Sequence, residues 1–419
     1  MKKQKFISLF SGAMGLDLGL EKSGYWECIF CLDNDKDAVK TIKMNRPKLP
    51  VYQDSIENFT GSTIRKDSGL SQNEDIPLVV GGPPCQSFSV FGKRKGIRDV
   101  RGQLVFEFLR IIKELKPKMF LMENVRGLLS MPLVPKKYKG KIEKTEEYMF
   151  KNGSLLNLLF NEYNNIGYHV DCYVVNSVNY GAPQIRERVV LIGNRFNKLS
   201  NFPDPEYSNR PKDGLPSFKT LGDIIGPKSA FRDPDPDLMN FSPRKLNYLK
   251  LVPPGGNWRS LPENIQKESM GKSWYLKGGR SAYWRRLSFD FPSPTVVTMP
   301  NHAGTSMCHP IEMRAITVGE AAAIQEFPSD WKFYGSSTSK FRQIGNAVPI
   351  RLGEAAGKIL WKLLLDINNN SGTDIQTLSR RIIHKRPHVR TKTYWKNGSA
   401  YSGNTSYYNN KESPQVSLL

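Results

Sequence analysis

The chain has 419 residues, 39% of them hydrophobic, which is enough for one large domain with a packed core and a second, smaller one. It contains 61 Lys and Arg against 39 Asp and Glu, and this net charge of +22 favours a polyanionic partner. No run of about 18 apolar residues occurs, which excludes a transmembrane helix, and the basic start leads into a Gly-rich turn without a signal-peptide cleavage site.

The number of cysteines indicates the cellular compartment of the protein. There are 5, a small and odd number that is typical of a reducing cytoplasm rather than of a disulfide framework. Cys28 and Cys31 form a lone CxxC within "WECIFCL", which has the pattern of a buried strand, and no second pair completes a metal site. We therefore expect a cytoplasmic protein that binds no metal.

In chain order, residues 5–195 alternate short apolar runs with longer amphipathic stretches. Strands are predicted at 5–10, 28–33, 49–54, 77–82, 118–124, 171–177 and 188–193. Helices are predicted between them, most clearly at 102–115 and 155–163. This alternation predicts an α/β fold with a parallel sheet covered on both faces, in the doubly wound, Rossmann-like order of nucleotide-binding domains.

The composition changes after the last of these strands. Residues 200–300 are rich in Pro, Gly, Asn, Ser, Arg and Trp, so we expect a first domain at 1–195 and a smaller, loop-rich domain at 196–339. A helical pattern then returns, and we expect 340–368 to pack back onto the first domain. The basic, Asn- and Ser-rich residues 369–419 are expected to form a flexible tail.

Three predicted strand ends point to a nucleotide cofactor. In "LFSGAMGLDLGL" (9–20) a strand enters a Gly-rich turn that opens a helix, which lets a ligand approach the backbone closely. Its spacing is not GxGxxG, so this turn alone is a weak signal. Asp33 ends the second strand, where a ribose diol is commonly bound, and Asp54 ends the third, within reach of an adenine amino group. Together they predict an adenosine-containing cofactor.

The next strand ends carry candidate catalytic groups. In "GGPPCQSFSVFGKRKG" (81–96) two prolines hold Cys85 just beyond an apolar strand, which favours a nucleophile over a buried structural cysteine. Glu123 ends the fifth strand at the same rim, and Arg186 and Arg188 share one face of a strand that follows the sixth. A structural carboxylate and a pair of exposed arginines remain the alternatives for these three residues.

These motifs resemble those of the carbon-5 cytosine-specific DNA methyltransferases. The matching segments, between about residues 5 and 365, are "LFSGAMG", "LDNDKDA", "QDSI", "GGPPCQSFS", "RGQLVFEFLRII", "ENVRGLL", "QIRER", "RAITVGEAAAIQEFP" and "QIGNAVP". Two residues depart from the family pattern: Met14 stands where a third glycine is usual, and Asp33 where Glu is usual. Neither removes a required functional group, so the resemblance implies an active enzyme.

The resemblance implies a reaction in which Cys85 adds to carbon 6 of cytosine and makes carbon 5 nucleophilic. Glu123 would hold or donate the proton at N3 if burial raises its pKa, and Arg188, with Arg186 beside it, would hydrogen-bond the 2-oxo group. The methyl donor would be S-adenosylmethionine. The residues expected to bind it are Phe10, Gly12, Met14, Gly15, Asp33, Asn34, Asp54, Ser55, Pro84, Leu104, Asn346, Ala347 and Val348.

The resemblance also implies double-stranded DNA as the substrate, with the target cytosine flipped out of the helix. The residues expected to contact DNA are Gln86, Ser87, Lys93, Arg94, Lys95, Arg259, Arg280 and Arg285. Some arginines of 200–300 are expected to bind only phosphate or to pack inside the small domain. For the Lys-rich insertion at 131–150, a solvated loop and a DNA contact both remain open.

We expect a monomer that works beside a cognate type II restriction endonuclease, although an orphan or phage methyltransferase would carry the same motifs. A transfer-RNA cytosine methyltransferase shares them but usually has a shorter variable region than the one between Arg188 and Gly345. Intact Cys85, Glu123 and Arg188 argue against a non-catalytic DNA-binding relative. Enzymes that methylate exocyclic amines carry an aromatic residue where this chain has Cys85.

Overall fold

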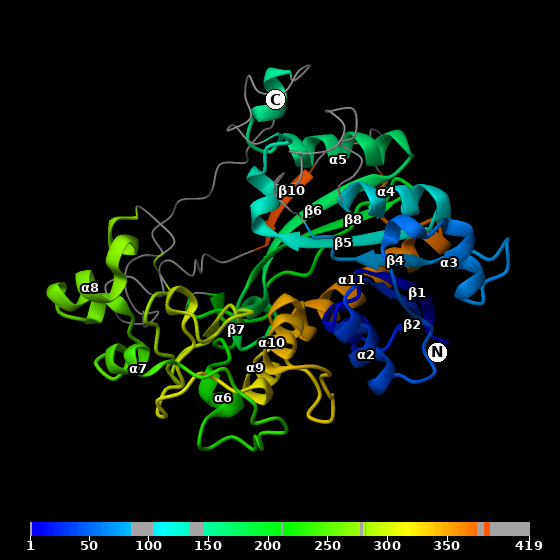
Figure 1. Cartoon of the computed structure of the whole chain (residues 1–419). Helices are drawn as coiled ribbons and strands as arrows, with labels where there is room; N and C mark the ends of the chain where they lie inside the picture. Colours follow the sequence, from blue (N-terminus) through cyan, green and yellow to red (C-terminus); the bar gives the residue numbers. More distant parts are fainter. Residues whose placement is uncertain are drawn as a thin grey trace.

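One large sheet forms the centre of the molecule (Figure 1). The computed structural model describes residues 2–84, 104–134, 146–210, 213–276, 280, 282–374 and 381–385. The eight-stranded sheet has the order β10-β6-β8-β5-β4-β1-β2-β3. In chain order its strands are β1 (Gln4–Leu9), β2 (Trp26–Asp33), β3 (Val51–Gln53), β4 (Leu78–Gly81), β5 (Met119–Val125), β6 (His169–Asn176), β8 (Glu187–Asn194) and β10 (Arg381–Lys385). Every strand predicted from the sequence is present.

The direction of β8 differs from that of the other strands. It runs antiparallel to both of its neighbours, β5 and β6, whereas the remaining pairs are parallel. The doubly wound α/β class is confirmed, but the prediction of a wholly parallel sheet is wrong for this strand. Only a 3-10 turn, η6 (Ser177–Tyr180), and a short strand, β7 (Gln184–Ile185), join β6 to β8. Without a crossover helix in the connection, the chain returns in the opposite direction.

Helices cover both faces of the sheet, as Figure 1 shows. One face carries α1 (Gly15–Lys22), α2 (Lys36–Asn45) and α11 (Ile350–Asn368), and the other carries α3 (Gly61–Asp67), α4 (Leu104–Leu115) and α5 (Ser154–Asn165). Successive side chains of a strand serve opposite faces: in β1, Phe6 packs into the first core and Ile7 into the second. This double burial explains why the strands are almost continuously apolar.

The segment 343–368 packs against the start of the chain. Helix α11 lies along α1, and the two approach so closely that a Cβ atom on Gly15 would lie 2.5 Å from the Val348 carbonyl oxygen. A Cβ atom on Gly19 would collide with the Ile350 carbonyl oxygen. These two glycines therefore serve the packing of two helices that are remote in sequence.

The expectation of a flexible tail at 369–419 is wrong for the part that the structure describes. Arg381–Lys385 form β10, which pairs in parallel with β6 at the edge of the sheet. Ile382 packs into one core and Ile383 into the other, so this short strand is anchored on both faces. Its neighbour β6 would otherwise present an unpaired row of backbone groups, which accounts for the pairing. Residues 386–419 lie outside the described part.

The small domain has its own apolar cluster, which draws on fewer residues than the expected range of 196–339. Helices α7 (Pro243–Leu249) and α8 (Glu263–Met270) surround an apolar cluster drawn from residues between 241 and 315, including Trp258 and Trp284. By contrast, α6 (Leu221–Ile225) and α9 (Val318–Ile324) pack into the core beneath the sheet, and Leu287, Val296 and Met307 also reach it. We therefore propose that the small domain is 241–315 rather than 196–339, because an independent core is what defines a domain.

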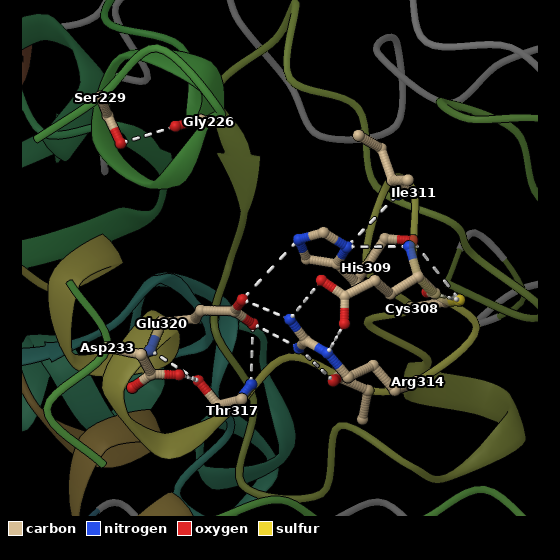
Figure 2. A network of polar contacts seen from close by, with 11 residues as sticks. Gly226, Ser229, Asp233, Cys308, His309, Ile311, Arg314, Thr317 and Glu320 are labelled. Carbon is tan, nitrogen blue, oxygen red and sulfur yellow. Dashed lines mark hydrogen bonds and ion pairs between the residues drawn. The ribbon is translucent and has the colours of Figure 1, made fainter. Parts of the chain in front are cut away.

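A polar network joins the small domain to α9 (Figure 2). The Nη1 and Nη2 atoms of Arg314 each lie 2.8 Å from an Oε atom of Glu320, and its Nε lies 2.7 Å from Oε2 of Glu312. Glu320 also accepts a hydrogen bond from the Thr317 N–H (2.9 Å) and so caps the first turn of α9. The Thr317 hydroxyl in turn donates to Asp233 (2.7 Å).

His309 completes this network. Its Nε2 lies 3.7 Å from Glu320 Oε1, and its Nδ1 accepts hydrogen bonds from the N–H groups of Ile311 and Glu312. Burial lowers the pKa of His309, so it is neutral near pH 7. Arg314 is therefore the cation that balances the buried Glu320 carboxylate.

We expect Glu320→Gln to lower the free energy of unfolding by about 2–3 kcal/mol, somewhat less than for a fully buried ion pair because Arg314 is partly exposed. Glu312→Gln is the matched control, since Glu312 binds the same guanidinium from an exposed position, with 59% of its side chain accessible. Its effect should stay within about 1 kcal/mol. Urea unfolding of both variants measures the difference, and equal losses would refute this account of the network.

Candidate active site

A cavity of about 830 Å³ opens at the carboxyl ends of β1, β2, β4 and β5, where ligands bind in doubly wound sheets. Most residues singled out in the sequence lie on it, although they come from distant parts of the chain. Those lining it are Phe10, Gly12, Gly15, Asp33, Asn34, Asp54, Ser55, Pro84, Leu104, Glu123, Arg186, Arg188, Asn346, Ala347 and Val348.

The turn after β1 is held by the end of β2. Gly12 has a φ of +52°, and its N–H donates to Asp33 Oδ2 (2.8 Å). The other carboxylate oxygen, Oδ1, accepts from the N–H of Asp35 (2.8 Å), and burial raises the pKa of Asp33. Asp33 therefore organises the wall of the cavity as well as lining it. On the next strand end, Asp54 Oδ1 accepts from the N–H of Ser55 (2.7 Å).

Met14 differs from the expectation. Its side chain is fully buried in the core between α1 and the sheet, and it is not among the residues that line the cavity. Its φ of +67° places it in the left-handed region, which explains why glycine suits this position. We therefore withdraw the Met14 side chain from the cofactor site, because an apolar side chain at this turn is better buried than exposed to a polar cavity.

Glu123 and Arg188 form a buried ion pair on the cavity wall. Arg188 Nε lies 2.7 Å from Glu123 Oε1, and only 10% and 11% of the two side chains are exposed. Their strands, β8 and β5, are neighbours, and Val125 is the residue opposite Arg188. Burial raises the pKa of Glu123 although Arg188 and Arg186 both lower it. A raised pKa favours the protonated form of Glu123, which is the form that can donate a proton.

Arg186 ties together three segments. Its Nη1 donates to the Val296 carbonyl (3.2 Å) and its Nη2 to the Gly345 carbonyl (2.7 Å), while its Nε has no hydrogen-bond partner among the residues described. The guanidinium is buried and lines the cavity, and burial lowers its pKa. Arg186 therefore positions the cavity walls, and Arg188 is the arginine paired with the carboxylate.

The turn that leads to Cys85 is held beside Glu123. Asn124 Nδ2 donates to the Pro83 carbonyl (2.8 Å), and a Cβ atom on Gly82 would lie 3.3 Å from Glu123 Oε2. This fixes the chain up to Pro84 at the cavity. Cys85 and the neighbouring DNA-contact candidates Gln86, Ser87, Lys93, Arg94 and Lys95 lie outside the described residues.

Part of the cavity wall was not predicted. Thr295–Thr298 line it from within the range 241–315, and Asn124, Gln343 and Asp17, which also line it, were assigned no role. A buried amide holds the first of these segments in place: Gln184 Oε1 accepts from the Val296 N–H (2.9 Å). The segment "PTVVTMP" has no feature that marks it as a cavity wall, because its position results from this remote contact.

Comparison with known proteins identifies the family of this chain. A family model for C-5 cytosine-specific DNA methylases matches residues 4–362. The chain belongs to this family. The methylase is 38% identical over 368 residues to the type II methyltransferase M.PspPI of Psychrobacter sp. (strain TA137), a match that covers 87% of this chain and 80% of that protein. It is 37% identical to M.Sau96I of Staphylococcus aureus, with 88% and 78% covered.

Solved structures show the same fold. A putative DNA modification methyltransferase encoded in a prophage of E. coli is 25% identical, with a TM-score of 0.57 over 87% of this methylase and 100% of that chain. DNMT2 of Spodoptera frugiperda, at 16% identity and a TM-score of 0.57, shows the fold alone.

No helix among the described residues is long and apolar enough to cross a membrane.

The described arginines of the methylase's small domain lie in different environments. The guanidinium carbons of Arg259 and Arg280 lie 4.4 and 4.9 Å from the centre of the Trp258 ring, and both side chains are half-buried. Arg285 is buried instead, and its Nε donates to the Ser306 carbonyl (3.1 Å). The expectation that Arg285 contacts DNA is therefore corrected, because its charged group is enclosed within the protein.

The cavity of the methylase fits an adenosylated amino acid. It has acidic strand ends for hydroxyl and amino groups at Asp33 and Asp54, and a wall of backbone at 345–348. One buried carboxylate oxygen on its wall, Asp17 Oδ1, has no hydrogen-bond partner in the described part of the chain. A cationic, polar ligand suits this set of groups better than an apolar one.

Proposed function

We propose that this DNA cytosine-5 methyltransferase uses S-adenosylmethionine and is the modification enzyme of a type II restriction–modification system. The observation that carries the reaction is the buried Glu123–Arg188 pair on the same cavity as the Pro83–Pro84 turn, which immediately precedes Cys85. The similarity to type II methyltransferases supports the biological setting.

Cys85 would be the nucleophile. Addition of its thiolate to carbon 6 of a flipped cytosine forms a carbon–sulfur bond, and the electron pair of the 5,6 double bond then makes carbon 5 nucleophilic. When bound, S-adenosylmethionine would supply the methyl group that carbon 5 receives, and S-adenosylhomocysteine would be the leaving group. Loss of the proton from carbon 5 then restores the double bond, and the carbon–sulfur bond breaks to release Cys85 as a thiolate.

Glu123 and Arg188 would stabilise the negative charge that addition of the thiolate places on the cytosine ring. A protonated Glu123 can donate its proton toward N3, and its raised pKa keeps that form available at higher pH than an ordinary glutamic acid does. Arg188 can hydrogen-bond the 2-oxo group, since its guanidinium lies on the cavity beside Glu123. Both groups act most strongly in a buried site, where water does not screen them.

DNA would lie across the small domain and the cavity. The net charge of +22 favours phosphate contacts, and Arg259 and Arg280 beside Trp258 are our candidates for base or phosphate contacts. We propose a monomer that acts in the compartment holding the chromosome, together with an endonuclease of the same sequence specificity. Profiling methylated sites of single arginine variants would separate base readers, which relax one position, from phosphate binders, which weaken all sites.

The test has two parts. Bisulfite sequencing of DNA from a host that expresses the chain should reveal 5-methylcytosine in one sequence context, and that DNA should resist an endonuclease that cleaves the same sequence. DNA with 5-fluorocytosine at the target should form a denaturation-resistant adduct with the wild type and none with Cys85→Ser. Methyl transfer to transfer RNA but not to DNA, or an adduct with the Ser variant, would contradict the proposal.

A further inference from the structure

Asp17 is a buried carboxylate in the wall of the cavity. It lies in the first turn of α1, is 1% exposed, and lines the cavity together with Ser8, Ser11 and Gly15. These residues surround the turn between β1 and α1. Asp33 and Asp54, the candidates for binding ribose and adenine, lie at other strand ends. Asp17 therefore lies in a third region of the same cavity.

No cation among the described residues balances this carboxylate. Asp17 takes part in none of the ion pairs that the structure describes, and within the same part of the chain its buried Oδ1 has no hydrogen-bond partner. The Ser8 side chain and the backbone N–H of Asp17 itself hydrogen-bond the carboxyl group. A buried carboxylate with only these two partners is costly to keep ionised, because most of its hydration is lost.

The charged groups around Asp17 add to this cost. Glu21, one turn further along α1, and Asp33 at the end of β2 are both acidic, and the buried thiol of Cys28 on β2 supplies no positive charge. Both neighbouring carboxylates already have partners: Glu21 pairs with Arg46 (2.9 Å), and Asp33 binds two backbone N–H groups. Burial, aided by these two charges, raises the pKa of Asp17 to about 7.

We propose that Asp17 binds the ammonium group of the methionine part of S-adenosylmethionine through its unpartnered oxygen. This rests on the proposed function, because that function supplies the ligand. An ammonium provides both a positive charge and the N–H donors that Oδ1 lacks, and a charge-assisted hydrogen bond in a buried site is strong. The sulfonium carries a positive charge but no hydrogen-bond donor, so it could balance the charge of Asp17 without giving Oδ1 a hydrogen bond.

Three ligands separate the alternatives. S-adenosylhomocysteine keeps the ammonium but lacks the sulfonium charge, and 5′-methylthioadenosine lacks the whole amino-acid part. In Asp17→Asn, S-adenosylmethionine and S-adenosylhomocysteine should both bind about 10- to 100-fold more weakly, as expected for the loss of one charge-assisted bond. Binding of 5′-methylthioadenosine should be unchanged. Isothermal titration calorimetry of the full chain measures all three dissociation constants.

Glu21→Gln is the matched control. It removes a carboxylate one helical turn away that does not line the cavity, and should leave the affinity for S-adenosylhomocysteine within about twofold, well below the tenfold that 1.4 kcal/mol represents. Unchanged binding of both ligands to Asp17→Asn would overturn the proposal. Weakening of S-adenosylmethionine alone would assign Asp17 to the sulfonium, and weakening of 5′-methylthioadenosine as well would show a merely structural role; either result overturns the ammonium assignment.

The wild type provides a second test that needs no variant. Only the ionised carboxylate attracts a cation, so affinity for S-adenosylhomocysteine should rise as pH increases from about 5.5 to 7. Binding should also release protons, which calorimetry detects by comparing buffers of different ionisation enthalpy. A flat pH profile without proton release would overturn the proposal. If the wild type binds none of the three ligands, the proposed cofactor itself fails, which is a distinct result.

Discussion

Replacement of Glu123 by Gln should lower kcat for methyl transfer by about 10²- to 10⁴-fold, the range expected for loss of a positioned general acid. Gln has the same shape and can still accept a hydrogen bond from Arg188, but it cannot hold or transfer a proton. Affinity for S-adenosylhomocysteine should change little, because the ion pair lies at the catalytic end of the cavity, beside the turn that precedes Cys85. Single-turnover rates and calorimetric binding measure the two quantities separately.

Glu326→Gln is the control for this experiment. Glu326 is also a largely buried glutamate next to an arginine, with Arg351 Nε 3.3 Å away, and burial likewise raises its pKa. It does not line the cavity. Both variants remove the charge of a largely buried glutamate that pairs with an arginine, yet only Glu123→Gln should lose the rate. A Glu123→Gln variant with more than about a tenth of the wild-type rate, above the range for a general acid, would show that the carboxyl proton is dispensable.

The second large effect is expected in stability. Arg186→Met should lower the free energy of unfolding by about 2–6 kcal/mol, because it leaves two buried carbonyl oxygens, those of Val296 and Gly345, without their donors, at about 1–3 kcal/mol each. Removal of a buried cation restores part of this free energy, because the cost of its burial disappears. The substitution also takes away one of the two positive charges that lower the pKa of Glu123. Urea unfolding measures the change.

Arg65→Met provides the comparison. Arg65 also donates to two carbonyls, those of Ser71 (2.9 Å) and Glu74 (2.7 Å), although both bonds start from Nη1, and its side chain is only half-buried. Water can replace it there, so the loss should be below about 1.5 kcal/mol, the net worth of an ordinary hydrogen bond. Arg186→Met should also weaken S-adenosylhomocysteine binding, because the chain from Gly345 to Val348 lines the cavity. Equal losses in the two variants would refute the argument from burial.

The sequence by itself determined the strand ends and the residues placed on them. Asp33, Asp54 and Glu123 each follow or end an apolar run, and the ends of parallel strands meet at one edge of a sheet. The class of fold followed from the same alternation of strands and helices. These features are local, because the period of a strand or helix and the chemistry of a turn are determined by neighbouring residues.

Contacts between remote segments were decided only by the tertiary structure. The direction of β8, the pairing of β10 with β6, and the buried positions of Met14 and Arg285 depend on which surfaces meet after the chain has folded. The same holds for Asp17, whose place in an ordinary amphipathic helix gives no sign that it has no cationic partner among the described residues. Its isolation is visible only when β1, β2 and α1 are packed together, because burial and charge balance are properties of the assembled core rather than of a stretch of sequence.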